Sequence, residues 1–566
     1  MTYRVITATL TARTAVHIGS GEGNDLTDAL LRRDAAGRPI IPGTAIAGAL
    51  RSLLTRLSPR LWAEKPPCVA LTGGSGSCSC PVCHLFGDVN PTDEEGSQSA
   101  ASRLLVFNAT PSGNLPRSLI RDGVGIDRVT GAAARAGAVK FDLEVLPAGA
   151  TFDLRLELRD AAPEDEALLA AGLAEWQARR LWLGGRVARG LGAFDLSDLA
   201  YRTLSLEEPA HLMTFLKDDQ PWKQAQTQPD WLAKQLATLH PVSNSHQSEA
   251  ITRGWVTVTG LLQAEGPLLT NDTLTSGATG FDHAPLLAQW GDWRQPVLTG
   301  AGLRGVLRSH AERIARTLAT HNAAGQEVFL QKCPACSPVE SRAGEPLASC
   351  DTLLKGKISS DKIVDDEHLC LACRLFGSTR RGSRLMVEDA LFAGDKPPTL
   401  KMLDFLAIDR FTGGGAEGAK FDALALWNPA FALRLHLENP APWELGWLAL
   451  VLRDLAEGWL TVGFGAAKGF GRVRLENWVA TFGYLTPDDA PDLVQRHLIT
   501  QTSGVYTTAQ VTEATTGWRA LAQQWVNTFR KQVNENFARP EELALTQDSY
   551  FGRVDTLYPV LKGGAQ

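Results

Sequence analysis

Hydrophobic and polar positions follow two periods along the first 200 residues, and their order predicts one small α+β unit. Residues 3–10 and 152–159 alternate with the period of two that is typical of strands, so the four apolar side chains from Phe152 to Leu158 should face a core. Helices are expected at 44–57 and 164–182, and short strands at 103–107 and 191–196. The order β-α-β-β-α-β is typical of the ferredoxin-like split βαβ plan.

The same pattern returns in the second half of the chain. The segment DALLRRDAAGRPIIPGTAIAGALRSLL at 28–54 corresponds to DHAPLLAQWGDWRQPVLTGAGLRGVLRS at 282–309. Further pairs follow in the same order: CHLFGD (83–88) with CRLFGS (373–378), ASRLLVFNA (101–109) with GSRLMVEDA (382–390), and FDLRLELR (152–159) with FALRLHLE (431–438). Because the order holds while loop lengths differ, the sequence predicts two tandem copies of one domain.

The repeat sets the expected boundaries. Copy 1 spans 1–205, with insertions at about 62–100 and 108–150, and copy 2 spans 255–484, with insertions at about 330–378 and 400–430. Residues 206–254 should form a partly helical, packed linker. The tail, 485–566, is expected to contain one amphipathic helix with Trp518, Leu521, Trp525 and Phe529 on its apolar face.

Composition narrows the class of protein. The 566 residues are 44% hydrophobic, which suits a globular protein with sizeable cores. No apolar run is long enough to span a bilayer, so we expect a cytoplasmic protein without a membrane partner. The net charge of −6 argues mildly against a surface coated in nucleic acid, but it leaves room for a local basic groove.

Nine cysteines fall mainly into two groups that each precede the sequence Leu-Phe-Gly. The predicted zinc ligands are Cys68, Cys78, Cys80 and Cys83 in copy 1, and Cys333, Cys336, Cys370 and Cys373 in copy 2. Four thiolates leave no open position on a tetrahedral ion, so such sites are structural. Cys350 is expected to be a bystander, although it or His84 could replace a ligand. The alternative is that these cysteines are reduced thiols buried in the core and bind no metal.

Two aspartates occupy matching positions, Asp28 and Asp282. A lone aspartate in a loop is most often a turn or cap residue, and it is a poor general base near neutral pH. It could instead hold a hydrated Mg²⁺ or orient a nucleophile. Asp25 and Asp272 lie nearby and could take that role.

Cations recur beside glycines in both copies. The motifs IDRVTG (126–131) and IDRFTG (408–413) supply Arg128 and Arg410, and Lys140 and Lys420 follow them. Such an arm could contact a phosphate chain, or it could be a hairpin whose arginine pairs with its own aspartate. The glycine-rich segments 184–192 and 463–471 could approach phosphates or simply allow tight packing. No serine-hydrolase elbow, dinucleotide fingerprint or HExxH motif is present.

This succession of motifs resembles the RAMP superfamily, and within it the crRNA-binding backbone subunits of type III CRISPR-Cas effector complexes. The tandem arrangement is similar to the two-copy fusions of type III-D-like systems. The resemblance implies an RRM-like palm in each copy, with a β-hairpin thumb at 108–150 and 400–430. It also implies three kinds of partner, namely crRNA, target RNA and other type III CRISPR-Cas subunits.

The resemblance assigns roles to matching residues. Asp28 and Asp282 would each direct one cut in target RNA by attack of the 2′-OH, with Mg²⁺ or Mn²⁺ as cofactor. The expected RNA contacts are His17, Gly43, Thr44, Arg51, Arg128 and Lys140 in copy 1, and Gly300, Arg308, Arg410 and Lys420 in copy 2. Two alternatives stay open: a scaffold that binds crRNA without cutting, and an endoribonuclease that processes precursor crRNA. The duplicated arm favours repeated contact along one strand over a single processing cut.

Overall fold

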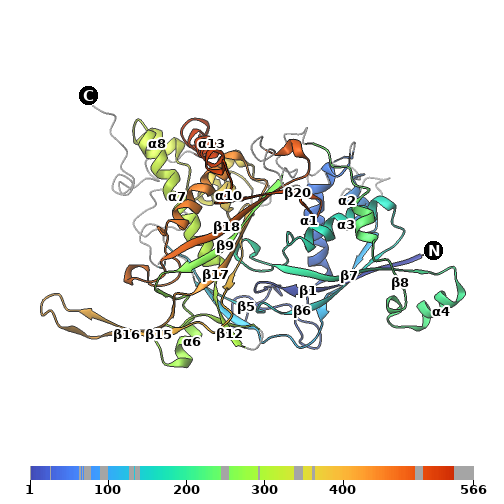
Figure 1. The fold of residues 1–566 in the computed structure, drawn as a ribbon, viewed down its shortest axis with the longest axis horizontal. Coiled ribbons are helices and arrows are strands. Elements are labelled where there is room, and N and C mark those ends of the chain that lie inside the picture. Colours follow the sequence, from blue (N-terminus) through green and yellow to red (C-terminus); the bar gives the residue numbers. More distant parts are fainter. Residues whose placement is uncertain are drawn as a thin grey trace.

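The computed structural model describes residues 2–25, 27–62, 65–66, 68, 78–88, 100–126, 133, 140–243, 254–290, 293–336, 348–359, 364–490, 501–540 and 543. Two α+β units lie side by side, copy 1 at the N-terminal end and copy 2 at the C-terminal end (Figure 1). No helix in these ranges combines the length and apolar character needed to cross a membrane.

Copy 1 has the predicted β-α-β-β-α-β order. Its elements are β1 (Thr2–Ala12), α1 (Gly43–Leu57), β2 (Leu104–Val106), β6 (Thr151–Leu158), α3 (Pro163–Gln177) and β7 (Phe194–Ser205). The sheet is antiparallel with the order β2-β6-β1-β7, to which β3 (Thr110–Pro111) and β8 (Gln226–Thr227) add short edges. A central first strand beside the third and fourth is the ferredoxin-like arrangement.

The helices of copy 1 pack on one face of this sheet. Leu50 and Leu54 of α1 and the whole apolar row from Phe152 to Leu158 are buried, as the periodicity predicts. Two details differ. Helix α1 starts at Gly43 after Pro42, so Thr44 is an exposed first-turn residue and not the N-cap. Helix α3 ends at Gln177, and the positive φ of Arg179 (64°) turns the chain away before Trp182.

Copy 2 repeats this plan with additions. Its elements are β9 (Gly254–Ala264), α7 (Gly300–Asn322), β13 (Leu385–Val387), β14 (Ala390–Phe392), β17 (Ala430–Glu438), α11 (Pro442–Ala456) and β18 (Val473–Tyr484). The sheet order is β11-β12-β14-β17-β9-β18-β20-β19, with β13 also on β17. The outer strands are β11 (Leu287–Trp290), β12 (Trp293–Leu298), β19 (Gln501–Ser503) and β20 (Tyr506–Thr512). The tail strands β19 and β20 are not predicted by the sequence.

The tail helix is the predicted one. Helix α13 (Trp518–Lys531) packs on α11, and its Phe529 is fully buried. The Phe529 ring stacks on Trp447 with 5.1 Å between the ring centres. Because this contact joins the tail to the core of copy 2, residues 501–537 extend that unit and do not form a separate one.

A β-hairpin projects from each copy. In copy 1 it comprises β4 (Leu119–Val124) and β5 (Lys140–Val145), and the predicted Arg128 lies outside the described residues. In copy 2 it comprises β15 (Leu400–Ile408) and β16 (Gly415–Trp427), paired at its base with β10 (Pro267–Leu268). Figure 1 shows this second hairpin extending well beyond the body of the molecule.

Shorter elements complete the insertions and the linker. The insertions carry α2 (Pro81–Phe86), α8 (Gln326–Lys332), α9 (Cys350–Leu354) and α10 (Leu371–Phe376), whereas α6 (Thr273–Thr279) lies between β10 and β11. The linker carries α4 (Pro209–Lys217), a 3-10 turn η3 (Pro221–Lys223) and α5 (Trp231–Leu236). Trp231 is buried and stacks on Tyr201 at 4.4 Å, so this end of the linker is fixed to copy 1.

A buried polar cluster joins the two copies. The Glu388 carboxylate accepts hydrogen bonds from Arg13 Nη2 (2.7 Å) and Trp182 Nε1 (3.3 Å) of copy 1, and from Arg434 Nε (3.2 Å) of copy 2. Asp389 accepts from Arg121 Nη1 at 2.6 Å. Copy 1 and copy 2 contribute different surfaces, so the contact is heterologous.

Candidate functional site

Asp28 lies exposed in the loop between β1 and α1, beside the middle of the described part of the copy 1 hairpin. Its Oδ2 accepts a hydrogen bond from the backbone N–H of Asp142 at 2.8 Å. The next residue, Ala29, forms a parallel bridge with Leu143 of β5. The loop is therefore held against the hairpin, and the carboxylate faces solvent in a fixed position.

Asp282 occupies the same position in copy 2. It is exposed, and its Oδ2 accepts from the backbone N–H of Asp422 at 2.9 Å. His283 forms the matching parallel bridge, with Ala423. The sequences around the two aspartates differ, so this shared geometry, and not the local residues, establishes that Asp28 and Asp282 are equivalent.

Each site contains two further acids that were not predicted. Asp122 faces Asp142 across the copy 1 hairpin, and Asp404 faces Asp422 in copy 2. Partial burial and the neighbouring Asp122 carboxylate raise the pKa of Asp142, and the charge of Asp28 adds to this. The repeated sequence Lys-Phe-Asp at 140–142 and 420–422 was the available signal.

The glycine-rich loops bring cations to these acids. Arg186 lies 4.0 Å over the Phe141 ring, where burial and the charge of Arg189 lower its pKa while Asp28 opposes this. In copy 2, Lys468 lies 5.3 Å over the equivalent Phe421. Both loops therefore carry a positive charge to the acid site, as well as packing tightly beneath it.

Burial and the charge of Lys468 lower the pKa of His283, which follows Asp282. Lys140 and Lys420 are exposed near the hairpin acids, with Lys140 Nζ 3.8 Å from Asp142 and Lys420 Nζ 3.5 Å from Asp404. Acids and cations thus lie close together on both hairpins.

The copy 2 hairpin presents its predicted cation at the turn. Arg410 is exposed, whereas the Asp409 carboxylate accepts from the backbone N–H groups of Phe411 (3.0 Å) and Thr412 (2.7 Å). Asp409 therefore shapes the turn, and among the described residues it is Thr412 and Phe411, and not Arg410, that lower the pKa of its carboxyl group. Phe411 is 99% exposed at the tip.

Three predicted RNA contacts lie within the packed structure. His17 is 7% exposed, and its Nδ1 donates to the carbonyl oxygen of Glu144 at 2.8 Å. The N–H groups of Gly43 and Gly300 donate to Asn108 Oδ1 (2.9 Å) and Asp389 Oδ1 (2.8 Å). A side chain on either glycine would meet a strand carbonyl, so these glycines allow close helix–strand packing.

Arg51 and Arg308 also differ from expectation, because both point at the cysteine groups. Arg51 Nη2 lies 3.4 Å from Cys83 Sγ, and Arg308 Nη2 lies 3.5 Å from Cys373 Sγ. Arg308 is buried and binds Glu312 at 2.8 Å. The sequence left open that both arginines lie on a solvated helix face. In the structure the insertions cover that face, and the two guanidinium groups pack against the thiol clusters.

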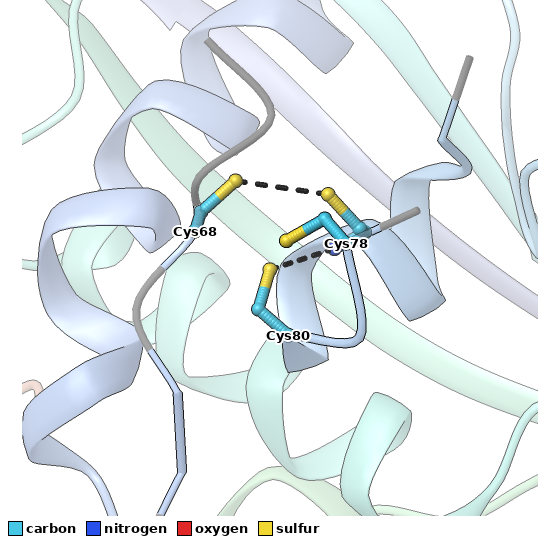
Figure 2. Close-up of side chains that lie close together, drawn as sticks. Cys68, Cys78 and Cys80 are labelled. Atoms are coloured by element: carbon cyan, nitrogen blue, oxygen red, sulfur yellow. Dashed lines mark hydrogen bonds between the residues drawn. The ribbon is translucent and has the colours of Figure 1, made fainter. Parts of the chain in front are cut away.

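The sulfur atoms of the copy 1 cysteines converge. Cys68, Cys78, Cys80 and Cys83 form one group whose ligand atoms all lie within 4.8 Å of one another. Figure 2 shows Cys68, Cys78 and Cys80 directed toward a common centre from two segments of the chain. This is the predicted group, and it could hold a structural zinc ion.

The copy 2 group requires a correction. Its members are Cys336, Cys350, Cys370 and Cys373, so Cys350 stands where Cys333 was expected. Cys333 directs its thiol to the Ala335 carbonyl oxygen at 3.3 Å, whereas Cys350 Sγ accepts from the Cys370 N–H at 3.4 Å. Cys350 lies at the start of helix α9, between the two CxxC pairs in the sequence, and the fold brings its thiol to the group. The spacing of the CxxC pairs alone cannot reveal this.

Carboxylates are suitable ligands for Mg²⁺ or Mn²⁺ at the acid sites. A cation there would be held by Asp28 with Asp122 or Asp142, and by Asp282 with Asp404 or Asp422. The converging donor groups found in the described ranges are the two cysteine groups and Asp365, Glu367 and His368. The acids on the hairpins are not among these groups.

Two ferredoxin-like units in tandem, each with an exposed acid fixed against a hairpin, define a duplicated palm-and-hairpin protein. The chain belongs to the RAMP superfamily, whose family model matches residues 9–195 and 284–474, one region in each copy. Membership supports a CRISPR-associated role in binding crRNA and partner subunits. No curated protein matches the chain.

Proposed function

We propose that this protein is a backbone subunit of a type III CRISPR-Cas ribonucleoprotein, and that it cleaves target RNA bound to crRNA at two sites. One observation carries the proposal: in each copy an exposed aspartate is fixed by an equivalent backbone N–H group of the hairpin, that of Asp142 or Asp422. A residue that served only as a turn former would not need this long-range contact with Asp142 or Asp422.

RNA supplies its own nucleophile for such a cut. The 2′-hydroxyl group loses its proton and its oxygen attacks the adjacent phosphorus; the bond to the 5′-oxygen breaks, and that oxygen takes up a proton. The products carry a 2′,3′-cyclic phosphate and a 5′-hydroxyl group. The protein must place the nucleotide in line and stabilise the charge that develops on the phosphate. Asp28 and Asp282 would orient the reacting group, while Arg186 and Lys468 would face the phosphate oxygens. A divalent cation at the acids would add positive charge there.

Cleavage assays on the assembled complex test the proposal. End-labelled target RNA with Mg²⁺ should give two cuts, of which Asp28→Ala removes one and Asp282→Ala the other. A 2′-deoxy nucleotide on the 5′ side of one scissile phosphate should abolish only that cut. Asp230→Ala and Asp395→Ala, which change exposed acids elsewhere in each half of the chain, are matched controls and should leave both cuts.

The outcomes separate three functions. Two cuts that persist in the Asp28→Ala/Asp282→Ala double variant would show that these acids are not responsible. Target RNA that stays intact while it binds the wild-type complex would favour a non-cleaving scaffold. Cleavage of precursor crRNA by the isolated chain would favour the processing enzyme.

A further inference from the structure

The outer face of the copy 2 sheet is the surface on which copy 1 sits. Leu433, Leu435 and Leu437 of β17 face the helices, so the alternate residues Arg434 and His436 face outward. Arg434 Nη2 donates to the Arg179 carbonyl oxygen of copy 1 at 3.3 Å. The His436 ring lies 5.0 Å from Trp182. This face of the fold therefore accepts another copy of the fold.

The same face of copy 1 is covered by the chain's own linker. Strand alignment makes Arg155 equivalent to Arg434, and Tyr3 equivalent to Trp255. Phe215 of α4 lies 5.0 Å from the Tyr3 ring, and Trp222 of η3 lies 4.3 Å from the Arg155 guanidinium. We call residues 209–223 the strap. Figure 1 shows α4 at the end of copy 1 remote from copy 2.

Helix α4, the first part of the strap, is held lightly, whereas Pro221 of η3 is buried. All nine residues of α4 have exposed or half-buried side chains, and Met213 and Leu216 are 46% and 67% exposed. By contrast, Trp231 in the following helix is buried. Few buried contacts mean a low free energy of local opening, so the strap can lift while β7 and α5 keep the linker in place.

The opposite end of the molecule is open. In copy 1, Gly190 packs against Gly300 and Asp389 of copy 2 so closely that a side chain there would overlap them. The equivalent Gly469 of copy 2 has free space within 4 Å, as far as the described part of the chain extends. Trp459, which corresponds to the interface residue Arg180, is 72% exposed.

Copy 1 thus carries, beneath the strap, a sheet face equivalent to the face of copy 2 on which copy 1 sits. Copy 2 carries, uncovered, a surface equivalent to the one that copy 1 places on that face. A heterologous interface of this kind adds subunits head to tail unless something blocks it. We propose that the strap occupies the accepting face of copy 1 and prevents the copy 2 end of another molecule of this chain from docking there. The proposal depends on the fold alone and not on RNA cleavage.

Two strap variants test this. Phe215→Ser/Trp222→Ala removes both ring contacts, and a second variant replaces residues 209–223 with a Gly-Ser segment of equal length. Sedimentation velocity over a range of concentrations should show the wild type as a monomer of 61.0 kDa. Both variants should form multiples of that mass, at a concentration at least tenfold below any association of the wild type. Leu216→Ala, on the exposed side of α4, is the matched control and should stay monomeric.

A second-site change identifies the docking surface. Adding Gly469→Asp to either strap variant should restore the monomer, because it places a charged side chain at the free counterpart of Gly190. Folded strap variants that stay monomeric at every concentration would overturn the proposal, with circular dichroism verifying the fold. Association that Gly469→Asp leaves unchanged would also overturn it, because it would show non-specific contact between apolar side chains.

Discussion

Equivalent residues in the two copies make equivalent contacts even where the sequence around them differs. Asp28 and Asp282 accept from equivalent backbone N–H groups of the hairpins, and Arg51 and Arg308 reach equivalent thiols. Because local context does not force either contact, each follows from the shared fold. The exposed pair is the candidate for chemistry, and the half-buried and buried arginines are candidates for structure.

The cysteine assignments give a prediction at this scale. Cys350→Ser should reduce the zinc content of the purified chain from two ions to one, because it removes a member of the converging group. Cys333→Ser should retain two ions, since its thiol binds the Ala335 carbonyl oxygen. Elemental analysis by mass spectrometry measures both. The reverse pattern would return Cys333 to the ligand set.

The two hairpins are equivalent elements in different surroundings. Arg121 and Leu119 of the copy 1 hairpin contact copy 2, whereas the copy 2 hairpin extends into solvent (Figure 1). Its outward face carries Met402, Leu406 and Ile408, which are 60%, 53% and 59% exposed. Apolar side chains that are more than half exposed on a projecting hairpin indicate a binding surface.

We predict that Phe411 at the hairpin tip contributes to RNA binding. Phe411→Ala should change the free energy of unfolding by less than about 0.5 kcal/mol, because the ring is 99% exposed. If the ring stacks on a base, the loss is about 1–3 kcal/mol, or roughly 5- to 150-fold in affinity. Filter binding with guide–target RNA measures this. Val328→Ala, on an exposed site of α8, serves as the control, and unchanged binding by Phe411→Ala would exclude a contact with RNA.

On the scale of the whole molecule, the interface between the copies contains a buried histidine. His436 is 2% exposed, and its Nδ1 pairs with the Thr257 hydroxyl at 2.8 Å. Burial lowers its pKa well below the usual range, and the charges of Arg434, Arg180 and Arg56 add to this. The imidazole, which lies between Trp182 and Trp255, is therefore neutral in the folded chain.

This interface should weaken in acid. Below about pH 6.5 the unfolded chain binds a proton at His436 that the folded chain excludes, so the free energy of unfolding falls by up to about 1.4 kcal/mol per pH unit. His436→Gln keeps a partner for Thr257 but removes the titration. Urea unfolding at pH 7.5 and 5.5 should show a loss about 1 kcal/mol larger in the wild type than in the variant. Equal losses would show that His436 does not contribute.

The sequence alone determined the duplicated ferredoxin-like order, the buried rows of β6 and α1, and the copy 1 cysteine group. Each of these predictions rests on the periodicity of apolar residues or on short sequence spacing, which follow from the local geometry of helices and strands. It also singled out Asp28 and Asp282, because a repeat exposes matching positions.

Tertiary structure decided what depends on contacts between distant segments. Only the folded chain replaced Cys333 with Cys350, turned Arg51 and Arg308 toward the thiols, and added the tail strands to the copy 2 sheet. The same is true of the acids across each hairpin and of the strap over copy 1. No periodicity encodes these pairings, because the free energy that selects them arises only when both partners are already in place.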